Sequence, residues 1–142
     1  MTALAALAVP GELAAQQVPV AQQASERLPI AAGETVTARI VGNGFVVWTR
    51  ERGEPSAVVP EGTVRFSMTG GEGMTMLHVE NGTGRAFEYR ARMFLGTRSA
   101  ATSTCTVLPG VTGFEHWPHA IDRLELSAPQ LLEQQPSGIN CR

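Results

Sequence analysis

The chain has 142 residues, the usual size of one domain and long enough to bury a hydrophobic core. Its formal net charge is −2, and acidic and basic residues are mixed along the sequence. This balance predicts no basic face that could follow a phosphate backbone, so we expect no nucleic-acid partner. All 11 residues in the Lys and Arg class are arginine, which is typical of a GC-rich bacterial genome.

Residues 1–29 are interpreted as a signal peptide followed by a linker. Residues 3–9 form a short apolar run, and a candidate cleavage site follows at Ala15, in the order of a secretory signal. No arginine or lysine precedes Arg27, so the positively charged start of such a signal is missing from this sequence. No later segment approaches the roughly 20 apolar residues that span a bilayer. We therefore expect a periplasmic or secreted protein without a membrane span.

From residue 30 onward, short runs of alternating apolar and polar residues are separated by turn residues, as in β-strands. The polar, proline-containing stretch 50–62 predicts a surface loop with a short edge strand at 57–59. One helical turn is expected at 131–135. Seven longer strands are expected at 35–41, 45–49, 63–69, 74–80, 87–95, 102–108 and 121–127.

About seven antiparallel strands of this length favour two sheets packed face to face over a closed small β-barrel, which is the alternative. We therefore predict that residues 30–142 form a single all-β domain, an immunoglobulin-like antiparallel β-sandwich. The expected likeness is one of architecture alone. Cys141 lies beyond the last expected strand, so the cysteines do not have the arrangement of an antibody domain.

Cys105 and Cys141 are the two cysteines of the chain, and we predict that they form a disulfide bond. The bond would close a loop of roughly 36 residues and stabilise the fold by 3 to 4 kcal/mol. It would also fit an exported protein, because disulfides persist in oxidising compartments. The alternative is two unrelated buried thiols, which the position of Cys141 at the end of the sequence disfavours.

Glu115, His116 and His119 form the densest group of side chains that could carry chemistry. Two histidines three residues apart, with a carboxylate, can bind zinc or copper if all of them point inward. The surrounding prolines and glycines instead predict a surface loop, in which Trp117 caps the core and the histidines are solvated. We therefore expect no metal and no cofactor, and a metal site here remains the alternative.

No catalytic residues are predicted. His119 and Asp122 could serve as the base and the orienting carboxylate of a catalytic triad, but no serine lies in a nucleophile-elbow motif. Asp122 is the single aspartate of the chain, which argues against a calcium site. The glycines at 70–73 join two expected strands and lack the lysine and helix of a phosphate-binding loop.

Arg90, Arg92 and Phe94 alternate with apolar residues in the segment 87–95, so they are expected on an outward face. Such a basic strip could recognise an anionic glycan or a partner protein. The alternative is that these arginines form cross-strand ion pairs with glutamates. Trp117 is a fourth interaction candidate, because an exposed tryptophan in a loop needs packing or a partner.

These patterns favour a non-enzymatic binding or interaction module of the bacterial cell envelope, with a protein or polymer partner. One alternative is a metal-binding protein or metal-dependent hydrolase that uses residues 115–119. A second alternative is an inhibitor of a secreted enzyme, with the loop at 50–60 or at 109–119 inserted into the target's cleft.

Overall fold

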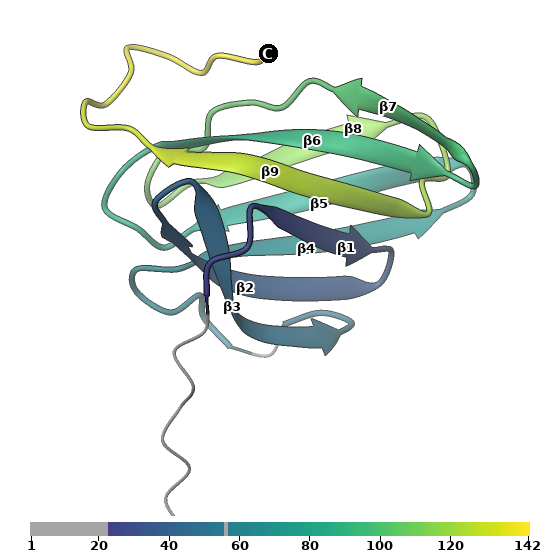
Figure 1. Ribbon diagram of the computed structural model, residues 1–142, viewed down its shortest axis with the longest axis horizontal. Helices are drawn as coiled ribbons and strands as arrows, with labels where there is room; N and C mark the ends of the chain where they lie inside the picture. Colours follow the sequence, from purple (N-terminus) through teal and green to yellow (C-terminus); the bar gives the residue numbers. More distant parts are fainter. Residues whose placement is uncertain (1–22, 56) are drawn as a thin grey trace, which may run out of the picture.

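Two antiparallel β-sheets packed face to face make up the fold (Figure 1). The computed structural model describes residues 23–55 and 57–142, so most of the predicted signal segment lies outside the described residues. All of the regular secondary structure in the described part is strand. The predicted all-β sandwich is thereby confirmed. The sheets are separate and do not close into the alternative barrel.

The four-stranded sheet brings together the two ends of the domain. Its order is β1 (Arg27–Ala31), β9 (Arg123–Leu131), β6 (Phe87–Leu95) and β7 (Arg98–Thr102). Strand β1 already belongs to this sheet, and Ser25 exchanges two backbone hydrogen bonds of 2.8 Å with Phe45. The sandwich therefore includes residues that precede the expected start at residue 30.

The five-stranded sheet has the order β3 (Gly44–Arg52), β2 (Glu34–Val41), β4 (Val64–Gly71), β5 (Met74–Asn81) and β8 (Thr112–Trp117). Antibody constant domains instead place their first strand beside the second, and the second beside the fifth. The likeness to immunoglobulin domains is thus one of architecture alone, as the cysteine positions predicted.

Strand β8 was not predicted, because the turn-forming residues near it suggested a loop. Residues 112–117 in fact pair with β5 along their whole length, with Phe114 opposite His78 and Trp117 opposite Thr75. Six of the seven longer strands expected are present, and β1, β7 and β8 bring the number described to nine.

The strand predicted at 102–108 is only partly regular. Strand β7 ends at Thr102, and the following residues still run beside β6, where Phe87 and Val107 exchange backbone hydrogen bonds of 3.0 and 2.9 Å. Between Thr102 and Val107, the Thr104 hydroxyl donates to the carbonyl oxygen of Tyr89. This side-chain hydrogen bond takes the place of a backbone hydrogen bond between the two segments. The expected edge strand at 57–59 and the helical turn at 131–135 are wrong.

Aromatic side chains join the two sheets at the centre of the core. Phe66 on β4 contacts Phe45 on β3 edge to face, with ring centroids 6.0 Å apart. It also makes edge contacts with Phe87 and Tyr89 of β6, at 6.2 and 5.6 Å. Edge-to-face packing of this kind adds to the stabilisation from burial alone. Residues of β6 therefore point alternately into a tightly packed core and onto the outer face.

The predicted disulfide is present: the sulfur atoms of Cys105 and Cys141 are 2.02 Å apart. Thr104 and Arg142 exchange backbone hydrogen bonds of 2.8 and 2.9 Å, and the Thr106 amide donates to the Asn140 carbonyl at 2.8 Å. Residues 140–142, which we call the C-terminal segment, therefore lie alongside residues 104–106 (Figure 1).

Candidate ligand-binding surface

The outer face of β6 carries Arg90, Arg92 and Phe94, where the alternation predicted them. Both arginines are exposed, whereas Phe94 is half-buried. The guanidinium carbon of Arg123, from the neighbouring strand β9, lies 4.2 Å from the centre of the Phe94 ring. Arg90, Arg92 and Arg123 are called the arginine row below.

Cross-strand ion pairing does not neutralise the arginine row. Arg92 lies between Ala101 on β7 and Glu125 on β9, but the Glu125 carboxylate pairs with Arg27 at 3.3 Å. The guanidinium of Arg92 donates instead to the Ser99 hydroxyl at 3.3 Å. Among the residues that the structure describes, Arg90 and Arg92 form no ion pair.

Folding widens the basic strip that the sequence predicted at Arg90 and Arg92. The outward positions of β1, β6 and β9 bring together Arg27 and the three arginines of the row. Glu88 and Glu125 are the carboxylates on the same face. The excess of arginine is local, because the whole chain has a net charge of −2.

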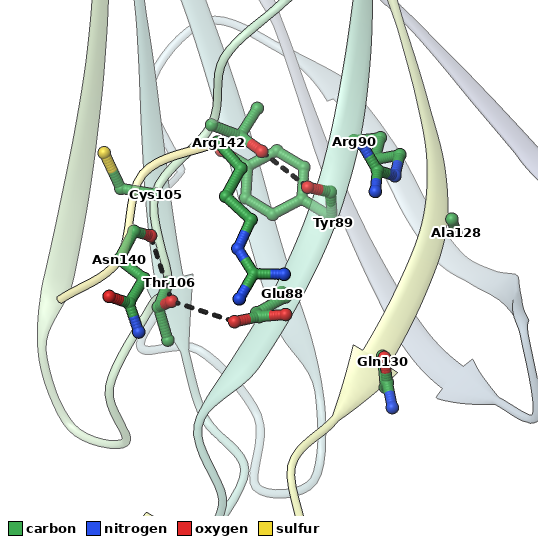
Figure 2. A pocket seen from close by; sticks show the side chains of 10 residues that line it. Glu88, Tyr89, Arg90, Cys105, Thr106, Ala128, Gln130, Asn140 and Arg142 are labelled. Carbon is green, nitrogen blue, oxygen red and sulfur yellow. Dashed lines mark hydrogen bonds between the residues drawn. The ribbon is translucent and has the colours of Figure 1, made fainter. Parts of the chain in front are cut away.

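A small pocket opens beside Arg90, at one end of the arginine row, and Figure 2 shows the side chains that line it. Its volume is about 170 Å³. The walls come from β6, β9, residues 104–106 and the C-terminal segment, so four parts of the chain meet here. We call it the tail pocket, and its lining residues are Glu88, Tyr89, Arg90, Thr104, Cys105, Thr106, Ala128, Gln130, Asn140 and Arg142.

Hydrogen bonds fix the polar groups of the tail pocket. The Thr106 hydroxyl lies 3.3 Å from a carboxylate oxygen of Glu88 and 3.1 Å from the carbonyl oxygen of Asn140 (Figure 2). The side chain of Arg142 extends across the pocket towards Glu88 in the same view. The pocket therefore has the Glu88 carboxylate on one side. The guanidinium groups of Arg90 and Arg142 and the amides of Gln130 and Asn140 complete its lining.

The residues of the alternative metal site, Glu115, His116 and His119, do not come together. Glu115 and His116 are neighbours on β8 and point to opposite faces of the sheet, while His119 lies beyond the end of this strand. A Glu115 carboxylate oxygen accepts a hydrogen bond of 2.6 Å from the Cys105 amide. In residues 23–55 and 57–142, no group of three metal-ligating side chains is found. Residues 112–117 are thus a strand and not the predicted loop, and the alternation along β8 separates Glu115 from His116.

Two other candidates have structural contacts. Trp117 is only 7% exposed, and its indole N–H donates to the Thr102 hydroxyl at 2.7 Å. This residue closes the core, as the simpler interpretation predicted. The Asp122 carboxylate accepts a 2.6 Å hydrogen bond from the Gly96 amide, so it holds the turn after β6 and orients no histidine.

Two titratable groups have a shifted pKa: Tyr89, which lines the tail pocket, and Glu115, which accepts from the Cys105 amide. Burial raises the pKa of Glu115, and the hydrogen bond from the Cys105 amide partly opposes this shift. Burial, and to a lesser extent the charge of Glu115, raises the pKa of Tyr89 well above its usual value. The Tyr89 hydroxyl is buried without a hydrogen-bond partner among the described residues. The Tyr89 side chain belongs to the core, whereas Glu115 is half-buried on β8.

The five-stranded sheet has a larger hollow on its own outer face, of about 470 Å³. Arg65 lies beside it, but its guanidinium donates to both carboxylate oxygens of Glu80, at 2.7 and 3.1 Å. A third hydrogen bond of 2.6 Å reaches the carbonyl oxygen of Ala57 in the loop that follows β3. The charge of Arg65 is thus neutralised by Glu80 within the fold.

Sequence reasoning missed Arg27, Arg123, Gln130, Asn140 and Arg142 as parts of the surface. The alternation of β9 could have placed Arg123 outward, but its position over Phe94 depends on the pairing of β9 with β6. Asn140 and Arg142 enter only because the disulfide draws their segment back to residues 104–106.

Comparison of the chain with protein-family models found no match, and neither curated proteins nor solved structures match it. None of the described residues belongs to a helix long and apolar enough to cross a membrane.

Proposed function

We propose that this protein is a non-enzymatic binding module of the bacterial cell envelope that holds an acidic polysaccharide along the outer face of β6. The observation that carries the proposal is the pair Arg90 and Arg92, which are exposed on one strand and have no ion pair within the described residues. Residues two apart on a strand are about 7 Å apart, so the two guanidinium groups can contact successive parts of one extended polymer.

The residues around the two guanidinium groups favour a ligand that approaches the sheet closely. Arg90 is opposite Ser127, and Arg92 is opposite Ala101 on its other side. These small side chains do not cover the guanidinium groups, and Glu125, the other neighbour of Arg92, pairs with Arg27. A guanidinium can donate two parallel hydrogen bonds to one carboxylate or sulfate group, which gives direction as well as charge attraction.

A polysaccharide fits this face better than a protein or a nucleic acid. The centres of protein interfaces are usually apolar, whereas the Phe94 ring is covered by Arg123. Nucleic-acid-binding domains are usually strongly basic, whereas this chain has a net charge of −2. The amides of Gln130 and Asn140 at the end of the row suit a ligand rich in hydroxyl groups.

The envelope location is part of the proposal and rests on two features. The Cys105–Cys141 disulfide is of a kind that persists outside the reducing cytosol. The interpretation of the apolar run at 3–9 and the candidate cleavage site at Ala15 as a secretory signal agrees with it.

The test is calorimetric titration of the full chain with polygalacturonate, dextran sulfate and neutral dextran. We expect both acidic polymers to bind, with affinity falling as salt is added, and neutral dextran not to bind. The Arg90→Gln/Arg92→Gln variant should lose about tenfold or more in affinity, since each lost charge-assisted contact contributes more than 1 kcal/mol.

The matched control is Arg50→Gln/Arg52→Gln, which removes the same charge from β3 in the other sheet. Equal loss in both variants would show attraction by net charge alone and would overturn the proposed surface. Absence of binding to either acidic polymer at low salt, or tighter binding of single-stranded DNA than of both polymers, would overturn the polysaccharide assignment.

A further inference from the structure

The tail pocket is continuous with the arginine row through Arg90, which belongs to both. Its volume of about 170 Å³ is below the 300 to 1,000 Å³ of pockets that enclose drug-sized ligands. A single sugar residue of a longer chain, with its neighbours continuing along β6, matches this size and position. The pocket therefore lies where a polymer on the arginine row would end or turn.

The polar groups of the pocket are held in place before any ligand binds. The disulfide and the paired backbones of Thr104 and Arg142 fix the C-terminal segment. The Thr106 hydroxyl lies within hydrogen-bond distance of Glu88 and so restrains its carboxylate. A preformed site loses little conformational entropy on binding, which favours selectivity for one shape of ligand.

The arrangement of charge defines what the pocket can accept. Arg90 and Arg142 offer planar sets of N–H donors that match a carboxylate. The carboxylate of Glu88 can only accept hydrogen bonds, so it requires a donor such as a sugar hydroxyl. The amides of Gln130 and Asn140 can each donate and accept. The complementary ligand has one carboxylate and several free hydroxyl groups within one small ring.

We propose that the tail pocket is a subsite for one uronic acid residue, so that the module prefers carboxylated over sulfated polysaccharides. The inference rests on the proposed function, because the pocket takes one residue of a polymer held by the arginine row. A uronic acid keeps its ring hydroxyls as donors to Glu88. Sulfation replaces hydroxyl donors with anionic acceptors, which the Glu88 carboxylate repels.

The test compares polygalacturonate with dextran sulfate of similar length, titrated into the full chain at the same ionic strength. We expect the wild type to prefer polygalacturonate by about tenfold, since one well-placed charge-assisted hydrogen bond is sufficient for this ratio. Glu88→Gln and Gln130→Ala should weaken binding of polygalacturonate and leave dextran sulfate unchanged or bound more tightly, so that the preference disappears.

Arg92→Gln is the matched control, because Arg92 lies in the row but not in the pocket. It should weaken both polymers equally and keep their ratio. The subsite would be overturned if the wild type bound both polymers equally, or if its preference survived Glu88→Gln. In either case, binding that depends on Arg92 would still support the proposed function. Binding of neither polymer would overturn both. Unchanged unfolding midpoints of the variants would show that they remain folded.

Discussion

Arg65 and Arg92 occupy equivalent positions in the two sheets, yet their surroundings differ. Each points outward from an interior strand, β4 or β6. Arg65 is only 5% exposed because the loop after β3 covers it, and it faces Glu80 on the next strand. Arg92 is uncovered, and its neighbour Glu125 pairs with another arginine. The same residue type is structural where a partner and a cover are present, and free to bind a ligand where they are absent.

The loop after β3 and the C-terminal segment are also attached to the fold in different ways. Hydrogen bonds from Arg65 and from the Thr35 hydroxyl attach the loop after β3, through Ala57 and Gly53. A covalent bond attaches the C-terminal segment, and the tail pocket is formed by that attachment. The structure thus predicts different responses to reduction and to loss of charge.

Removal of the disulfide should have the largest effect on stability. The Cys105→Ser/Cys141→Ser variant loses the closure of a loop with a sequence separation of 36 residues. This corresponds to about 4 kcal/mol in the free energy of unfolding, measured by urea denaturation. Wild-type protein in reducing agent should show the same loss. A loss below 1 kcal/mol in both would mean that the C-terminal segment contributes little to folding.

Arg65→Met and Arg92→Met test the comparison of the two arginines directly. Arg65→Met leaves Glu80 without its ion-pair partner and the Ala57 carbonyl without its donor. The free energy of unfolding should fall by about 2 to 3 kcal/mol, which is less than for a fully buried pair because Glu80 is partly exposed. The second should change stability by less than about 0.5 kcal/mol. Denaturation midpoints of the two variants provide the measurement, and equal losses would contradict the assignment of separate roles.

The pH dependence of stability should report the half-buried carboxyl group near the disulfide. Because the pKa of Glu115 is raised in the folded state, the folded protein binds this proton more tightly than the unfolded chain does. Its contribution to the free energy of unfolding is therefore present below the usual carboxyl pKa and is lost as the pH rises through the raised value. Glu115→Gln should flatten this part of the stability profile. An unchanged profile would argue against the shift.

A gain in stability is expected at Tyr89, where a buried hydroxyl lacks a partner among the described residues. Tyr89→Phe removes this polar group and keeps the ring contact with Phe66. We expect stability to rise by about 1 kcal/mol, because an unpaired buried polar group costs free energy. The thermal unfolding midpoint measures the change. A decrease would indicate that the hydroxyl is hydrogen-bonded in solution.

The sequence predicted the fold better than it predicted the surface. The alternation of 87–95 was sufficient to place Arg90 and Arg92 outward, because side-chain direction along a strand depends on local spacing alone. The tail pocket joins Glu88, Gln130 and Asn140, which are far apart in sequence and meet through strand pairing and the disulfide. Strand β8 was missed for a related reason, since its pairing with β5 overrides the turn-forming residues beside it.

The position of β1 has a consequence for the order of folding. Its single sheet partner is β9, and their register joins Arg27 to Ser127. During synthesis β1 must therefore wait for its sheet partner until β9 has emerged. Contacts this distant in sequence close slowly, because a long loop must form before the pairing stabilises it. The four-stranded sheet, and with it the proposed binding face, is completed only when the last strand arrives.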